Sequence, residues 1–251
     1  MTEVDFKIVV PARYQSTRFP GKPLALIDGV PMIVRVYQRV AGCAAEVVVA
    51  TDDHRIAQVC RKAGAEVCMT SADHETGTDR IAEVSEQRGW ADECVVVNVQ
   101  GDEPLIPLSS VRQVAANLHR VDDASISTLC TPIERNDEAS DPSNVKVVFD
   151  HLGMALYFSR MLIPHDRDAT AGLRCVYRHL GLYAYRAGFL KRFPSLPPCD
   201  IESLEKLEQL RALWNGERIH VDIATELPGP GVDTPEQLAE VEALFRQQQG
   251  S

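Results

Sequence analysis

The chain has 251 residues, of which 45% are hydrophobic and 25% charged, a composition typical of an ordinary globular protein. Lys and Arg number 26 and Asp and Glu 36, so the formal net charge is −10. That balance argues against a broad nucleic-acid or anionic-membrane surface, which would need a basic face. No apolar run approaches the roughly 18 residues of a membrane span, and the N-terminus does not resemble a signal peptide. We therefore expect a cytoplasmic protein whose seven scattered cysteines are reduced.

The first hundred residues alternate between short β-branched runs and amphipathic stretches. The expected strands are 6–10, 46–50, 66–69 and 94–99, and the expected helices between them are 32–41, 54–63 and 81–87. Near-continuous apolar strands indicate burial on both faces, as parallel sheets require. The alternation predicts an α/β fold with a doubly wound, mostly parallel sheet.

This rhythm loosens after Gly101. Strands are expected at 125–131, 145–149, 155–158, 179–185 and 219–223, and helices at 109–119, 201–215 and 235–248. A polar segment rich in small residues, 164–174, predicts a mobile loop. Several strands with few helices between them predict an antiparallel addition to the sheet, which we expect to serve dimerisation, and no domain boundary is evident.

The segment 11–23, PARYQSTRFPGKP, follows the first predicted strand and carries Arg13, Arg18 and Lys22. A single surface cation is usually just solvated, but three within ten positions, bounded by prolines and Gly21, favour an anion site. Ligands bind beyond the carboxyl ends of strands in open α/β sheets, and Lys and Arg are the usual phosphate binders. The sequence contains neither a Walker A pattern nor G-x-G-x-x-G. The loop therefore predicts a phosphate site of another kind.

Two further segments each place an acid where a metal could bind. In VNVQGDEP, Asp102 follows a buried strand, although Gly and Asp are also ordinary turn residues. In GVDTPEQL, Asp233 or Thr234 can cap the next helix, which is a sufficient reason for an acid there. Mg²⁺ that carries a nucleoside triphosphate is usually held by one or two carboxylates and phosphate oxygens. The two acids would make such a pair, but the sequence leaves open whether they meet.

The remaining polar candidates are individually ambiguous. In HETGTDR, Thr76 or Thr78 can cap a helix, or the helix N-terminus can lie beside a nucleotide. Arg160, Arg167, His179, Tyr183, Glu208 and Gln209 are each as easily solvated or structural side chains.

Eight blocks taken together resemble one family, the 3-deoxy-manno-octulosonate (KDO) cytidylyltransferases, or CMP-KDO synthetases. The resemblance runs from about residue 7 to about residue 244, through PARYQSTRFPGKPL, ATDD, HETGTDRIAE, VNVQGDEPLI, ALYFSR, RHLGLYAYR, LEKLEQLRALW and PGPGVDTPE. The opening loop alone indicates only the wider sugar nucleotidyltransferase superfamily, and the RHLGLYAYR and LEQLR blocks narrow it to this family.

The resemblance implies a Rossmann-like nucleotidyltransferase fold in a single domain, 1–251, that forms a homodimer. It places the nucleotide-binding half at about 1–120 and the sugar-binding and dimerisation elements at about 121–230. The implied reaction transfers CMP from CTP to the anomeric hydroxyl of KDO, with Mg²⁺ as cofactor. Its products are pyrophosphate and CMP-KDO, which serves lipopolysaccharide core biosynthesis.

The resemblance also assigns roles to residues. The catalytic positions are Lys22, Asp102 and Asp233, and the two acids are also the metal ligands. The CTP-binding positions are Ala12, Arg13, Ser16, Arg18, Lys22, Gly77, Thr78 and Arg80. The sugar-binding positions are Gln100, Arg160, Arg167, His179, Tyr183, Glu208 and Gln209, with Arg160 expected to pair with the sugar carboxylate.

Two alternatives remain at this stage. A related eight- or nine-carbon sugar acid, including an amino-substituted KDO, could take the place of KDO. A non-catalytic nucleotide-binding protein of the same fold is disfavoured, because we would expect it to have lost Lys22, Asp102 or Asp233, and all three are present.

Overall fold

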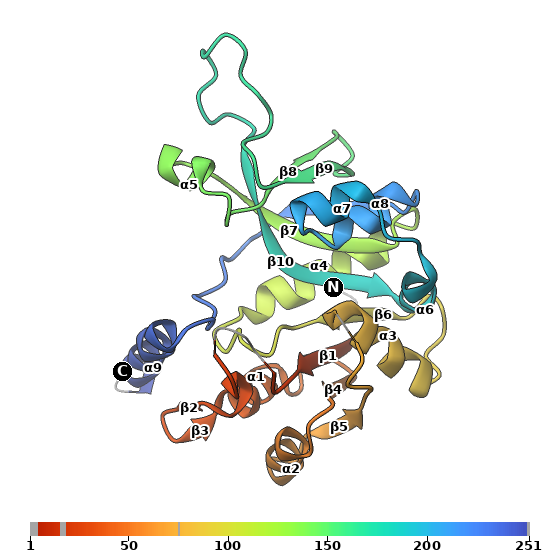
Figure 1. The fold of residues 1–251 in the computed structure, drawn as a ribbon, viewed down its shortest axis with the longest axis vertical. Helices are drawn as coiled ribbons and strands as arrows, with labels where there is room; N and C mark the ends of the chain where they lie inside the picture. The colour runs from red at the N-terminus through yellow and green to blue at the C-terminus, as the bar shows by residue number, and fades with distance from the viewer. Residues whose placement is uncertain (1–4, 16–18, 75, 250–251) are drawn as a thin grey trace.

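The computed structural model describes residues 5–15, 19–74 and 76–249. Within these residues one sheet of nine strands forms the centre of the molecule (Figure 1). Its main path has the order β11-β7-β10-β6-β1-β4-β5. These strands are β1 (Lys7–Ala12), β4 (Glu46–Thr51), β5 (Glu66–Met69), β6 (Val95–Asn98), β7 (Ile126–Pro132), β10 (Tyr177–Arg186) and β11 (Ile219–Ile223).

The predicted doubly wound, mostly parallel sheet is confirmed. Strand β1 pairs in parallel with β4 and β6, β4 pairs in parallel with β5, and β11 pairs in parallel with β7. Strand β10 is antiparallel to both of its neighbours β6 and β7. The predicted antiparallel addition is also present, as β8 (Lys146–Phe149) pairs with β9 (Ala155–Ser159) and with the start of β10.

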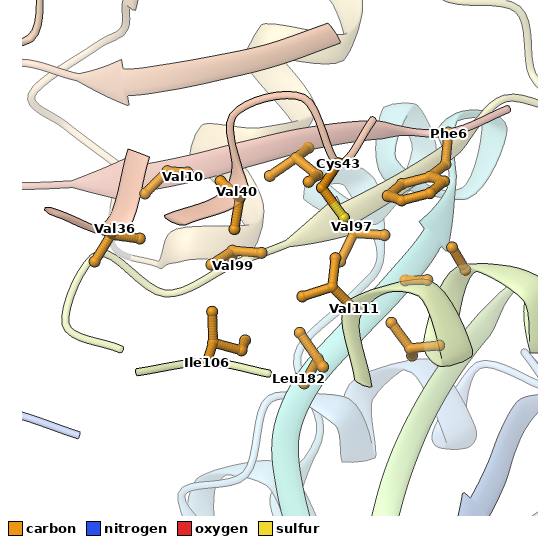
Figure 2. Packing of buried hydrophobic residues seen from close by; sticks show 14 of the residues in the cluster. Phe6, Val10, Val36, Val40, Cys43, Val97, Val99, Ile106, Val111 and Leu182 are labelled. Carbon is orange, nitrogen blue, oxygen red and sulfur yellow. The ribbon is translucent and has the colours of Figure 1, made fainter. Parts of the chain in front are cut away.

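Helices cover both faces of the sheet because its strands are apolar on both sides. In β1, Ile8 and Val10 belong to one buried cluster while Val9 belongs to the other. The first cluster packs against α1 (Met32–Val40), α2 (His54–Lys62) and α4 (Leu108–Arg120). Figure 2 shows part of it, with Val10 and Val97 of the sheet near Val40 of α1. The second cluster packs against α3 (Gly77–Gln87), α6 (Ala187–Arg192) and α8 (Gln209–Trp214).

The smaller elements lie around this frame. They are β2 (Leu26–Ile27), β3 (Val30–Pro31), α5 (Asn136–Ser140), α7 (Asp200–Glu205), α9 (Pro235–Gln249) and the 3₁₀ turns Lys22–Leu24 and Phe193–Ser195. Helix α9 packs against β2 and α1 through Ile27, Met32, Val232 and Val241. The segment between β9 and β10 projects away from the sheet as a long loop (Figure 1). This loop includes residues 164–174, for which the sequence predicted a loop.

The prediction of one continuous helix over 201–215 is wrong. The segment forms α7 and α8, and Lys206 between them has a left-handed backbone with φ 54°. Tertiary hydrogen bonds replace those of a continuous helix, because the Arg160 guanidinium donates to the carbonyls of Glu205 (2.6 Å) and Lys206 (3.4 Å). The predicted helix over 81–87 also begins earlier, at Gly77, because Thr76 and Asp79 form a capping box ahead of it.

No helix in the described ranges is long and apolar enough to cross a membrane.

Candidate active site

The cationic loop after β1 is held in shape by a tight turn at its far end. The Gly21 amide donates to the Tyr14 carbonyl at 3.1 Å, and Gly21 has φ 74°. A Cβ there would lie 3.2 Å from the Tyr14 hydroxyl oxygen, so the position needs glycine on both counts. The turn delivers Lys22 to the carboxyl edge of the sheet. Ser16 and Arg18 lie outside the described residues.

Asp102 and Asp233 do meet, and they meet at Lys22. The Lys22 Nζ lies 2.5 Å from Asp102 Oδ2 and 3.0 Å from Asp233 Oδ1. The main chain brings these distant acids together, since the Val232 amide donates to the Asp102 carbonyl at 2.9 Å. Gly101 lets the first acid approach the loop, because a Cβ there would lie 2.8 Å from the Pro11 carbonyl oxygen. The question that the sequence left open is therefore settled by the fold.

The charges of this cluster favour a protonated lysine between two carboxylates. Burial opposes the charged form of Lys22, but the attraction of Asp102 and Asp233 outweighs it and raises the pKa of Lys22 above its ordinary 10.5. Two carboxylate oxygens already converge on one cation here, and hard oxygen donors are what Mg²⁺ prefers. The described residues contain no cluster of three His, Cys, Asp or Glu side chains suited to a metal. The pair therefore fits a metal that takes its other ligands from phosphate and water.

This cluster lies in a cavity of about 310 Å³, which we call the nucleotide pocket. Its other lining residues include Ala12, Arg13, His74, Gly77 and Arg80, with Gln100 and Gly101 on the sheet side. Six of the eight predicted CTP-binding positions can be located, and five of them line this pocket. The sixth, Thr78, lines the neighbouring cavity.

Arg80 is a buried cation on the wall of the nucleotide pocket. It is 3% exposed, donates to Thr70 Oγ1, and its Nη2 lies 3.4 Å from Asp52 Oδ2. His74 lies on the same pocket, and its Nε2 is 2.5 Å from Glu83 Oε2. Both side chains come from the HETGTDR segment, at the N-terminal end of α3. These contacts fix the wall before any ligand binds.

A second cavity of about 150 Å³ adjoins the first and shares Gly77 and Gln100 with it. We call it the inner pocket. Four of the seven predicted sugar-binding residues line it, namely Gln100, Tyr183, Glu208 and Gln209. Its opposite wall is apolar and consists of Ile126, Phe189, Phe193 and Ala212.

The acid of the inner pocket is strongly influenced by burial. Burial raises the pKa of Glu208 above its ordinary 4.5, although hydrogen bonds from Thr78 and Thr76 oppose the shift. Thr78 Oγ1 donates to Glu208 Oε1, which connects α3 to the start of α8. Burial likewise raises the pKa of Tyr183 well above its ordinary 10, so this phenol stays protonated near neutral pH.

Three predicted sugar-binding residues do not line either pocket in the described structure. Each guanidinium nitrogen of Arg160 donates to a main-chain carbonyl, those of Pro142, Glu205 and Lys206. Arg167 is exposed on the long loop between β9 and β10. His179 lies behind Tyr183, with ring centroids 5.2 Å apart, and its Nε2 is 2.9 Å from Thr128 Oγ1.

Sequence reasoning missed two polar residues of the inner pocket, Asn98 and Tyr185. Each lies two positions from a residue that was predicted to bind the sugar, since Asn98 precedes Gln100 by two positions and Tyr185 follows Tyr183 by two. Period-two spacing along a strand places such residues on one face, and that signal could have found them.

The comparisons with known proteins agree with this geometry. A family model described as cytidylyltransferase matches residues 7–219. A 3-deoxy-manno-octulosonate cytidylyltransferase from Alkalilimnicola ehrlichii is 54% identical to the chain and covers 97% of it, as the chain covers 97% of that protein. The chain belongs to the 3-deoxy-manno-octulosonate cytidylyltransferase family. It is therefore a nucleotidyltransferase.

Solved structures support the same assignment. A CMP:2-keto-3-deoxy-manno-octonic acid synthetase, solved in complex with CTP, superposes with a TM-score of 0.90 at 42% identity. That match covers 97% of this chain and 99% of that protein. A cytidylyltransferase from Leptospira borgpetersenii, 15% identical, matches with a TM-score of 0.63 over 97% of this chain and 87% of that one, which shows the fold alone. The chain thus has the nucleotidyltransferase fold that the sequence predicted.

Proposed function

We propose that this chain transfers CMP from CTP to the anomeric hydroxyl of KDO, releasing pyrophosphate and using Mg²⁺. The observation that carries the proposal is the pair of adjoining pockets. The nucleotide pocket combines cations with two convergent acids. The inner pocket is a partly polar cavity that shares Gly77 and Gln100 with the nucleotide pocket. Two substrates bound there would meet at Gly77 and Gln100.

The residues of the nucleotide pocket bind and orient the triphosphate. Phosphoryl and nucleotidyl transfers leave a protein little covalent chemistry to perform, so positioning and charge stabilisation dominate. Arg13 and Lys22, together with Arg18 of the same loop, neutralise the charge that develops on the leaving pyrophosphate. The raised pKa of Lys22 keeps its ammonium group charged for this role.

Asp102 and Asp233 are the residues that would hold the metal. When bound, Mg²⁺ supplies Lewis-acid activation of the attacking hydroxyl and neutralises phosphate charge, so that no dedicated side-chain base is required. Their shared contact with Lys22 keeps the two carboxylates close together in the protein itself.

The inner pocket binds the sugar acid. Gln100, Tyr183, Glu208 and Gln209 offer hydrogen bonds to its hydroxyl groups, and the aromatic wall excludes water. Roles for Arg160, Arg167 and His179 in binding the sugar acid stay predictions. A carboxylate partner at Arg160 would have to share a guanidinium that already donates to three carbonyls.

The proposal extends to the setting of the enzyme. A homodimer is supported by exposed apolar side chains around β9 and α7, among them Leu156 at 63%, Met161 at 72% and Leu204 at 81% exposure. The seven cysteines all lie in described segments and none forms a disulfide, which supports a reducing compartment such as the cytoplasm. CMP-KDO would serve lipopolysaccharide core biosynthesis.

Pyrophosphate release tests the proposal directly. The enzyme is incubated with CTP and a panel of sugar acids, KDO and its amino-substituted relatives included, with and without Mg²⁺. We expect release with CTP and KDO that requires Mg²⁺. Release with UTP or dTTP and a sugar 1-phosphate instead would assign the chain to another branch of the superfamily.

A further inference from the structure

The inner pocket contains a buried polar atom that the fold leaves without a partner. Asn98, the last residue of β6, is 3% exposed and lines this pocket. Its Oδ1 is inaccessible to solvent and has no hydrogen-bond partner among the described residues. Seven side-chain atoms in the described ranges share this condition, and Asn98 Oδ1 alone belongs to a residue lining either pocket of the candidate active site.

The strand register fixes the direction in which Asn98 points. Asn98 stands opposite Tyr183 in the antiparallel pairing of β6 with β10, and directly opposed residues present their side chains on one face. Gln100 follows by two positions, and all three side chains line the inner pocket. Asn98 is thus part of the floor of the pocket, where it meets the sheet.

The orientation of the amide is set by its neighbours. The Asn98 and Thr78 side chains both lie near enough to the Tyr185 phenol to lower its pKa by hydrogen bonding, against the stronger effect of burial. Because Oδ1 has no partner in the described structure, the bond to Tyr185 must come from the amide nitrogen. Thr78 in turn donates to Glu208. A row of polar side chains therefore crosses the floor of the pocket, and Asn98 Oδ1 is the acceptor in it that has no partner among the described residues.

A buried acceptor without a donor is unfavourable, and native structures rarely keep one without a reason. An amide oxygen can only accept, so its partner must be an O–H or N–H group. A sugar acid with several hydroxyl groups presents such donors. A site built to bond a substrate hydroxyl rejects the analogue that lacks it, because the protein group then stays unpaired.

We propose that the Asn98 amide turns its buried Oδ1 into the inner pocket to accept a hydrogen bond from one hydroxyl group of the bound sugar acid, which makes Asn98 a specificity-determining residue for polyhydroxylated substrates. This proposal rests on the proposed function. It adds one residue to the sugar site and a rule for which sugars the site selects. The rule requires a donor at one particular carbon of the sugar.

The test compares the wild type with Asn98→Leu, whose side chain also branches at Cγ but carries no acceptor, over KDO and its monodeoxy analogues. Pyrophosphate release gives kcat and KM for each sugar and for CTP. We expect one analogue to lose about 10- to 100-fold in kcat/KM with the wild type, the loss typical of a single unpaired buried group. Asn98→Leu should show a loss of the same size with KDO, an unchanged KM for CTP, and no further loss with that analogue.

Ser85→Ala is the matched control, because Ser85 on α3 is fully buried and its Oγ also lacks a partner in the described structure, yet it lines neither pocket. It should keep the sugar profile of the wild type. An unchanged KM for KDO in Asn98→Leu, or equal losses with every analogue, would overturn the proposal. If Asn98→Leu does not fold, the wild-type profile decides, since an even loss across the analogues also overturns it.

The two levels of inference fail in different ways. A wild type that does not turn over CTP and KDO refutes the proposed function. A wild type that does so, but shows no selective loss with any one deoxy analogue, refutes the role of Asn98 alone.

Discussion

Acid should destabilise the fold through His179, which lies behind the inner pocket. Its ring packs edge-on against Phe158 at 5.0 Å between centroids, and its Nε2 is 2.9 Å from Thr128 Oγ1. Burial lowers the pKa of His179 from its ordinary 6.5 to about 3. The folded protein therefore keeps this imidazole neutral at pH values where the unfolded chain protonates it.

The sign and size of the effect follow from proton linkage. Because the folded pKa lies below the unfolded one, the unfolded state binds more protons, and stability is lost as the pH falls below about 6.5. Between pH 7.5 and pH 5.0 the loss from this one group is about 2 kcal/mol. The figure hardly changes for any folded pKa below about 4, because the native imidazole is then almost unprotonated at pH 5.0.

Urea unfolding at these two pH values, at one protein concentration, measures the loss. The drop in unfolding free energy from pH 7.5 to pH 5.0 should be smaller by about 2 kcal/mol in His179→Gln than in the wild type. His151→Gln is the control, since His151 is exposed and its replacement should leave the drop unchanged. Equal drops in the wild type and His179→Gln would refute the assignment of a buried neutral imidazole.

Three further predictions concern the site itself. Lys22→Ala and Asp102→Asn should each lower kcat by about 10²–10³ or more, since each removes a preorganised charge, and near-wild-type pyrophosphate release at saturating Mg²⁺ would contradict this. Glu208→Ala should weaken sugar binding while CTP binding is kept, and calorimetry that shows the reverse would move Glu208 out of the sugar site. Gly101→Ala should raise the KM for CTP and lower the melting temperature, because its Cβ would lie 2.8 Å from the Pro11 carbonyl oxygen; an unchanged melting temperature would mean that the loop shifts easily.

The nucleotide half of the site could be predicted from the sequence because its residues follow two parallel strands of the sheet, β1 and β6. Arg13 and Lys22 come after β1, and Asp102 comes after β6, which pairs in parallel with β1. The carboxyl ends of parallel strands meet at one edge of a sheet, so strand prediction alone places these side chains together. The position of Asp233 was not predictable in this way, because it depends on a main-chain bond from Val232 to Asp102.

The sugar half depends on features that local patterns do not record. Strand β10 shifts its register against β7 between Leu180 and Tyr183, and the irregularity brings His179 and Tyr183 within ring contact of each other. A uniform alternation along this strand, the only rule available from sequence, does not include such a shift. The prediction that groups His179 with the pocket residues therefore rests on resemblance, and in the structure His179 contacts Tyr183 without lining the pocket.

The break between α7 and α8 also depends on tertiary contacts that local sequence patterns do not record. The leucines at 204, 207, 210 and 213 favour one helix, yet Leu204 is 81% exposed whereas Leu207 and Leu210 are buried. Ser159 and the Arg160 amide both donate to the Glu205 carboxylate, at 2.7 and 2.9 Å, and so fix the end of α7 to β9. The chain restarts as α8 with Glu208 at its N-cap, where Glu208 lines the inner pocket. Around the break, Leu207 is buried in the core while its neighbour Glu208 is half-buried and lines the inner pocket. The contacts from β9 thus fix the end of α7 just before the segment that carries Glu208, while a role for Arg160 in sugar binding stays a prediction.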